Sequence, residues 1–157
     1  MTDMDRLTPE RRSWNMSRIT GRDTAPEQAL RRILHGIGFR FRLKTGAKIF
    51  GKPDVVLPKY RTVVFMHGCF WHRHRGCKHC YTPKTRADFW QRKFESNKKR
   101  DRKVIRALRH EGWRVLIVWE CQLRNILALE KRFSKVKSAY ARRTTSRTKT
   151  RRQTIPD

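Results

Sequence analysis

The feature that most constrains this chain is the segment 67–80, which holds four of its six histidines and three of its four cysteines. Thiol and imidazole groups at such close spacing are typical of a bound metal ion, and zinc takes four of them in a tetrahedron. The candidate ligands are Cys69, His72, His74, Cys77, His79, Cys80 and Cys121. A long loop of this kind needs a cross-link that holds it in one conformation, which favours a bound zinc ion over a set of reduced buried thiols.

Cys121 follows directly after an apolar segment, 115–119, that we expect to be a buried strand. A zinc ion held by Cys69, His74, Cys77 and Cys121 would tie the loop back onto that strand. Cys80 is the alternative to Cys77. A site with three thiolates and one imidazole is closed and structural. It would leave His67 and His72 free for other chemistry.

The charge of the chain indicates a polyanionic partner. The 157 residues contain 40 Lys and Arg against 13 Asp and Glu, a formal net charge of +27. Such a charge repels itself in the folded state and is typical of nucleic-acid binding. No run of eighteen apolar residues exists, and the N-terminus has no apolar signal-peptide region, so we expect a cytoplasmic protein without membrane contact. Cysteines in a reducing compartment are more often ligands or free thiols than disulfides.

The hydrophobic periodicity predicts one domain in which helices cover both faces of a small central sheet, an α/β or mixed α+β fold. Thr24 and Glu27 predict a capping box at the start of the first helix. The expected strands are 39–43, 54–57, 62–66 and 115–119, and the expected later helices are 85–109 and 125–133. We divide the chain into an N-terminal arm (1–23), a core domain (24–133) and a basic tail (134–157), disordered until it meets an anion.

Acidic residues are scarce, and three of them are expected to point inward. Asp54 begins an apolar strand, Glu27 ends the apolar stripe of the first helix, and Asp101 follows Asn97 on the stripe of the long helix. A buried charge is costly unless it is paired or binds a cation, so a shared site explains them best. Asp54 as a turn cap, Glu27 as a capping-box residue and an Asp101 salt bridge are the alternatives. With a free His67 or His72 nearby, the set fits metal-assisted phosphodiester hydrolysis; His67 as a core histidine and His72 as a phosphate contact are the other reading.

Several motifs together resemble the very short patch repair (Vsr) endonucleases. The matching segments are 15–16, 22–27, 51–54, 64–72, 85–90, 97–101 and 112–121, in register over about residues 13–125. The family is bacterial, and its fold is a restriction-endonuclease core with an added zinc site. The resemblance implies an enzyme that nicks one DNA strand 5′ of the thymine in T:G mismatches left by deamination of 5-methylcytosine.

The resemblance also implies roles for individual residues. Asp54 and the backbone carbonyl of Met66 would bind a catalytic Mg²⁺, and His72 would be the general base. His67, Asp101 and Glu27 would order metal-bound water. The structural Zn²⁺ would be held by Cys69, His74, Cys77 and Cys121, and the residues expected to wedge into the base stack are Met16, Phe70 and Trp71.

This chain departs from the family pattern in three places. Met66 stands where the best-known member has threonine, and Gly76 and Cys80 are additional residues in the cysteine-rich loop. The expected partners are double-stranded DNA with a T:G mismatch, mismatch-repair proteins and a repair polymerase. We expect a monomer associated with the bacterial nucleoid. The competing hypotheses are a non-catalytic, zinc-stapled nucleic-acid-binding protein and a nuclease that cuts intact restriction sites.

Overall fold

The computed structural model describes residues 8, 10–11, 14, 23–43 and 49–152, with side chains through residue 144. Its centre is a three-stranded sheet in the order β1 (Val55–Leu57), β2 (Thr62–His67), β3 (Arg114–Trp119). β1 pairs antiparallel with β2 across a short 3₁₀ turn, Pro58–Tyr60, and β2 pairs parallel with β3. The mixed α+β architecture that the sequence predicts is therefore present.

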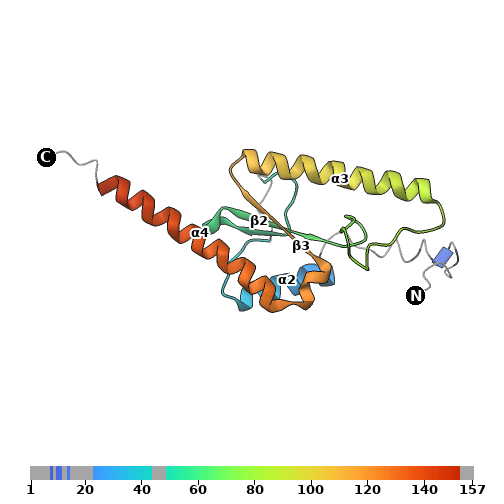
Figure 1. The fold of residues 1–157 in the computed structure, drawn as a ribbon, viewed down its shortest axis with the longest axis horizontal. Coiled ribbons are helices and arrows are strands. Elements are labelled where there is room, and N and C mark those ends of the chain that lie inside the picture. Colours follow the sequence, from blue (N-terminus) through green and yellow to red (C-terminus); the bar gives the residue numbers. More distant parts are fainter. Residues whose placement is uncertain (1–7, 9, 12–13, 15–22, 44–48, 153–157) are drawn as a thin grey trace.

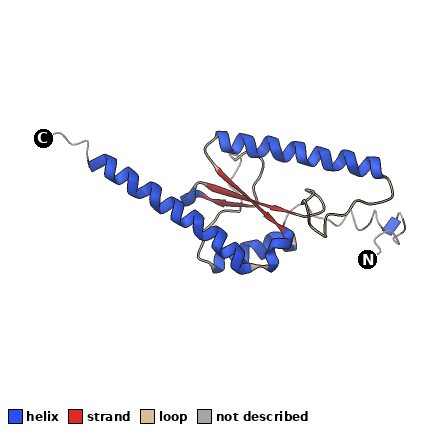
Figure 2. Cartoon of the chain, in the orientation of Figure 1, coloured by secondary structure: helices blue, strands red, loops and turns tan. Residues whose placement is uncertain are grey.

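Helices cover the two faces of the sheet (Figure 1). α3 (Ala87–His110) connects β2 to β3 and packs on one face, while α2 (Ala25–Gly36) and the first part of α4 (Ile126–Arg152) lie against the other (Figure 2). Successive side chains of a strand point to opposite faces. Accordingly Val64 and Met66 belong to the core beneath α2 and α4, whereas Val63 and Phe65 face the smaller core beneath α3.

β2 is the central strand that its apolar sequence predicts, and it carries the site. Its side chains are buried apart from the partly buried Phe65. Because β2 and β3 are parallel, their carboxyl ends meet at one edge, with His67 paired to Trp119. The loop 68–86 leaves β2 at this edge and returns to the start of α3 (Figure 1).

The prediction of a strand at 39–43 was wrong. Phe39 is fully buried, with its ring 5.1 Å from Tyr60 and 5.6 Å from Phe133. Only Arg42 reaches the sheet, through an isolated bridge to Val56 with backbone hydrogen bonds of 2.9 and 3.0 Å. The segment is thus anchored by one aromatic side chain rather than by a ladder. β3 also differs from expectation, since it lies at the sheet edge and buries only Val118 fully.

The last helix is longer than predicted. We expected it to end at Phe133 and the following tail to be disordered, but α4 continues to Arg152 and projects beyond the body of the molecule (Figure 1). Val136 is buried in the main core, and the Tyr140 ring contacts Tyr60 at 5.4 Å. These apolar contacts extend the packed part of the helix about two turns past Phe133. Most of the predicted N-terminal arm lies outside the described residues.

Candidate active site and metal centre

Asp54 lies just before β1 and is held against β2. Its backbone N–H donates to the carbonyl of Val64 (3.1 Å), and its Oδ2 accepts the backbone N–H of Met66 at 2.7 Å. Burial is the largest influence and raises the pKa of Asp54 to about 6, helped by the charge of Glu27. The Met66 hydrogen bond and the charges of Arg31 and His72 act in the opposite direction. Asp54 is therefore a fixed, half-desolvated carboxyl at the strand edge.

His67, His72 and Asp101 meet beside it, and their ligand atoms lie within 4.8 Å of one another. His72 Nδ1 is 2.5 Å from Asp101 Oδ2 on α3, and the His67 and His72 rings stack with centroids 3.8 Å apart. His72 is placed by a turn in which its N–H donates to the Gly68 carbonyl (3.1 Å). A carboxylate on Nδ1 leaves Nε2 of His72 as the basic nitrogen.

The two histidines differ electrostatically. Burial, followed by the charge of His72, lowers the pKa of His67 to about 4, so His67 is neutral at pH 7. Burial works against ionisation of Asp101, but the hydrogen bond with His72 and the charge of His72 hold the pKa of Asp101 below its ordinary value. The site thus contains an ionised Asp101 that contacts one histidine and a neutral histidine stacked on it.

Asn97 connects α3 to the cysteine-rich loop. It is buried one turn before Asp101, and its Nδ2 donates to the backbone carbonyl of Trp71 at 3.1 Å. Asn97 and Asp101 thus interrupt the α3 apolar stripe where the helix contacts the loop. The salt bridge named as the alternative for Asp101 is also present, with Arg100 at 3.6 Å.

Glu27 is buried near the start of α2, but the capping box predicted there has a different form. Thr24 makes no side-chain cap to the helix backbone; its hydroxyl donates to Glu27 Oε1 (2.8 Å), and the N–H of Asp23 donates to Oε2 (2.9 Å). Arg31 also contacts Oε2, at 3.3 Å. Since the Glu27 charge raises the pKa of Asp54, the structure brings Glu27 to the same region as Asp54.

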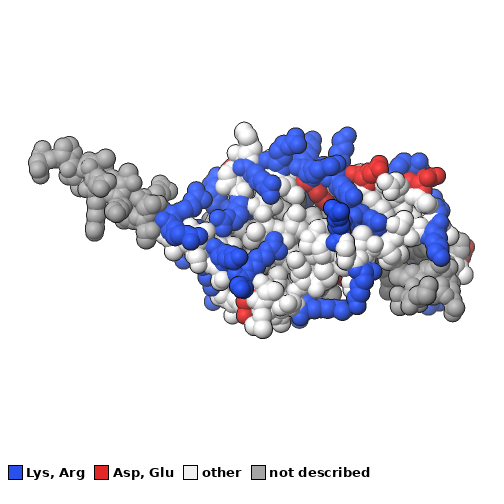
Figure 3. Space-filling model, viewed as in Figure 1, with Lys and Arg blue, Asp and Glu red and all other residues white. Residues whose placement is uncertain are grey.

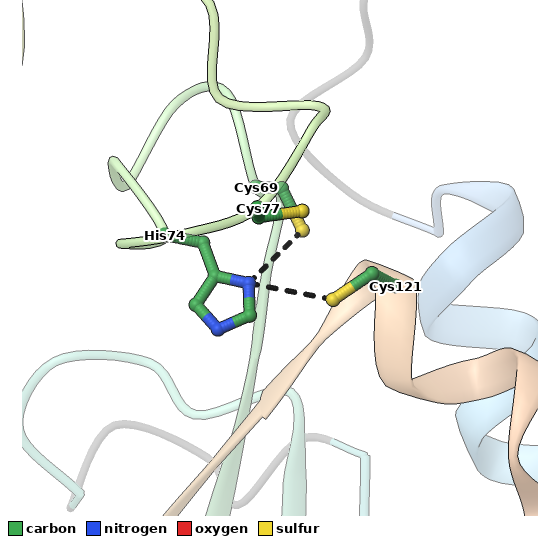
Figure 4. A group of neighbouring side chains, drawn as sticks. All are labelled: Cys69, His74, Cys77 and Cys121. Carbon is green, nitrogen blue, oxygen red and sulfur yellow. Dashed lines mark hydrogen bonds between the residues drawn. The ribbon is translucent and has the colours of Figure 1, made fainter.

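Four sulfur and nitrogen donors converge next to this region (Figure 4). The ligand atoms of Cys69, His74, Cys77 and Cys121 lie within 4.8 Å of one another, and His74 Nδ1 is 3.3 Å from Cys121 Sγ and 3.7 Å from Cys69 Sγ. His74 is further fixed by stacking on Trp119 (4.2 Å between ring centroids). Three thiols and one imidazole from two chain segments fit tetrahedral zinc. Cys80 is not a member of this group.

The predicted wedge residues lie in an aromatic cluster. Phe70 contacts four rings at centroid distances of 4.9–5.3 Å, those of Trp71, Tyr81, Trp90 and Phe94. Phe70 and Trp71 are both half-buried, whereas Tyr81 and Phe89 are more exposed, at 40% and 43%. Met16, the third predicted wedge residue, lies outside the described residues. Because four aromatic rings contact Phe70, we expect Phe70 and these neighbouring rings to contact a partner as one packed surface.

Sequence reasoning missed one residue next to the acids, Arg31. Its spacing of four residues after Glu27 on α2 is the signal that could have found it. Lys and Arg side chains also spread over much of the molecular face in Figure 3, with few acidic ones among them. Within the described part of the chain, no helix is both long and apolar enough to cross a membrane.

Comparisons with known proteins show the family of this chain. Residues 4–81 match the family model for the DNA mismatch endonuclease Vsr. The chain is 51% identical over 116 residues to the DNA mismatch endonuclease Vsr of Escherichia coli, covering 72% of this chain and 71% of the relative. It is 48% identical over 132 residues to the type II nicking enzyme V.XorIIP of Xanthomonas oryzae, covering 84% of this chain and 96% of the relative. A third relative, V.NmeAIP of Neisseria meningitidis, is 42% identical over 87% of this chain and 94% of its own length. The chain therefore belongs to the Vsr family of DNA mismatch endonucleases, with their restriction-endonuclease-like fold.

Proposed function

We propose that this protein nicks one DNA strand 5′ of the thymine in T:G mismatches that arise from deamination of 5-methylcytosine, in very short patch repair. The observation that carries the proposal is the His72–Asp101 pair stacked on His67 at the carboxyl end of β2, with Asp54 hydrogen-bonded to Met66 of the same strand, in a member of this family. A protein that only bound DNA would gain nothing from a desolvated Asp54 or from a carboxylate of Asp101 aimed at His72. Nicking needs such groups to hold a cation and activate water.

In this proposal His72 is the general base. Its Nδ1 is engaged by Asp101 at 2.5 Å, so Nε2 can accept a proton from the attacking water. Asp101 keeps the ring oriented and stabilises the imidazolium that forms. His67, neutral and stacked on His72, supports the ring and offers a nitrogen to ordered water.

Asp54 and the backbone carbonyl of Met66 would hold Mg²⁺, with Glu27 and Asp101 ordering its water ligands. The donor set fits, since a hard cation prefers carboxylate and carbonyl oxygens, and Asp54 is a half-buried carboxyl with no lysine or arginine in direct contact among the described residues. When bound, Mg²⁺ would stabilise negative charge developing on the scissile phosphate.

Zn²⁺ held by Cys69, His74, Cys77 and Cys121 would be structural. The loop 68–86 contains no helix or strand, yet it must place Phe70, Trp71 and His72 accurately. Three of the ligands lie in this loop and the fourth follows β3, so zinc would fix the loop to the sheet edge.

Recognition would combine a wedge with backbone contacts. The side chains that would enter the base stack are those of Phe70, Trp71 and Met16. Unstacking a base step costs a few kcal/mol, and the cost is smallest next to a weakly paired mismatch. The basic residues of α4, which includes most of the tail 134–157, would contact DNA phosphates without reading the base sequence. We further propose that the protein acts as a monomer in the bacterial cytoplasm, at the nucleoid, followed by mismatch-repair proteins and a repair polymerase.

The test uses a synthetic duplex with a single T:G pair, in several flanking contexts, with Mg²⁺. Asp54→Ala and His72→Ala should slow nicking severely, by about a hundredfold or more, while retaining binding to the duplex. The matched controls are Asp88→Ala and His110→Ala, exposed residues at the two ends of α3, which should nick like the parent. Equal nicking by all four variants would show that the site assignment is wrong.

A further inference from the structure

Arg31 is the basic side chain that contacts the acids at the start of α2. Its Nη1 lies 2.5 Å from Asp23 Oδ1, and its Nη2 lies 3.3 Å from Glu27 Oε2. The Arg31 side chain is only 17% exposed, although most arginines in the described part of the chain are exposed. The guanidinium is therefore held in place rather than solvated.

The helix face that carries Arg31 points toward the sheet. Glu27, Leu30, Arg31 and Leu34 follow the i, i+3, i+4, i+7 spacing of one face. Leu30 and Leu34 are fully buried and share a core cluster with Val55 and Met66. Val55 follows Asp54 in the chain, and the backbone N–H of Met66 donates to the Asp54 carboxylate. Packing thus brings the charge of Arg31 to the sheet edge where Asp54 lies.

Helix stability alone does not explain this arrangement. The Arg31 Nε is buried and has no hydrogen-bond partner among the residues that the structure describes. A buried donor left unsatisfied is destabilising, and such groups concentrate where function requires a particular charge.

We propose that Arg31 is a positioning residue of the acidic site. Its positive charge partly cancels the negative charges of Glu27 and Asp54, and so limits how tightly the site binds a divalent cation. This inference rests on the proposed role of Asp54 in cation binding. Arg31 acts through charge rather than through the geometry of Glu27, because two other donors, the Asp23 N–H and the Thr24 hydroxyl, already fix that carboxylate. A weaker cation site would exchange Mg²⁺ readily.

The sign of the expected effect follows from Coulomb's law. Removing a unit positive charge lessens the repulsion of a divalent cation, so cation binding should tighten, on the order of tenfold. Arg31→Met removes the charge, and Arg31→Gln removes it while keeping hydrogen-bond donors for Glu27. Arg31→Lys keeps the charge and should stay within about twofold of the parent.

The experiment measures Mn²⁺ binding to the full-length protein without DNA, from the electron paramagnetic resonance signal of free Mn²⁺. Circular dichroism checks that each variant is folded. The matched control is Arg32→Met, which removes an exposed positive charge from the next position of the same helix. Screening by water and salt should leave its Mn²⁺ affinity within about twofold of the parent. Asp54→Ala identifies the part of the binding that belongs to the site.

The inference is supported if Arg31→Met and Arg31→Gln both bind Mn²⁺ more tightly than the parent and Arg32→Met does not. Unchanged or weaker binding by the folded Arg31→Gln variant would overturn it, and Arg31→Gln decides the matter should Arg31→Met fail to fold. If the parent binds through Asp54 but Arg31 has no effect, only this inference fails. If Asp54→Ala binds Mn²⁺ like the parent, both this inference and the cation-binding role of Asp54 are wrong.

Discussion

Replacing Asp101 with asparagine tests whether a side chain on α3 orients the candidate general base. Asparagine has the size of aspartate, so the packing of α3 should survive. The substitution removes the charge that lies 2.5 Å from His72 Nδ1 in a pair whose side chains are 16% and 17% exposed. His72 would keep its place in the loop but lose the partner that stabilises it when it takes a proton.

The expected magnitude follows from that contact. A hydrogen bond to a charged group contributes about 1.5–3 kcal/mol. If this interaction strengthens as His72 becomes charged in the transition state, its loss lowers the nicking rate about 10- to 150-fold. DNA affinity should change little, because Asp101 is mostly buried and lies beneath the loop rather than on its surface.

The assay is single-turnover nicking of a T:G duplex at saturating Mg²⁺, with Asp88→Asn, an exposed aspartate on the same helix, as the control. A double-mutant cycle separates the two roles of Asp101. If Asp101 acts through His72, then Asp101→Asn should cost little more in a His72→Ala background. A loss below about threefold in the single variant, with the parent's melting temperature, would refute the reasoning.

Three further predictions concern the zinc site, the buried histidine and the tail. Cys121→Ser should lose zinc and lower the melting temperature, whereas Cys80→Ser should retain one zinc per chain by metal analysis; zinc loss in both variants would contradict the ligand set. The pKa of His67 is about 4 when folded and 6.5 when exposed, so the unfolded state binds more protons between these values and stability should fall by up to about 3 kcal/mol as the pH drops from 6.5 to 4. His67→Gln should remove this component in denaturant titrations, and an unchanged pH slope would count against it. Deleting residues 145–157 removes four basic residues and should reduce the salt slope of DNA binding by up to about 3.5 with mismatch preference intact; a lost preference would show that the tail reads the lesion.

Much of the fold followed from periodicity. The apolar runs at 54–57, 62–66 and 115–119 are β1, β2 and β3, and the stripes on the first and long helices are α2 and α3. The 39–43 segment failed because alternation cannot distinguish a strand from a loop anchored by one buried residue, Phe39. The length of α4 was readable in principle, since Leu129, Phe133, Val136 and Tyr140 are spaced by four, three and four residues. The high charge of the surrounding sequence masked that pattern.

The candidate site was predictable where a polar residue stands at a position that the apolar pattern assigns to a buried side chain. Asp101 and Asn97 interrupt an apolar stripe, and the structure shows that they contact the loop at His72 and Trp71. The grouping of Cys77 rather than Cys80 with the other donors depends on the path of the loop, which spacing alone does not determine. Arg31 was missed because its spacing of four residues after Glu27 is a weak signal in a chain with 40 basic residues. Only its burial between two acids distinguishes it.

The most direct test of the central claim is a strand-resolved nicking assay. Each strand of a T:G duplex carries its own end label, and matched T:A and C:G duplexes of the same sequence run beside it, with Mg²⁺ or with EDTA. We predict a single nick 5′ of the mismatched thymine, none in the other strand, none in the matched duplexes and none with EDTA. Cutting of matched duplexes at the same rate, or binding without any Mg²⁺-dependent cut in every flanking context, would contradict the account.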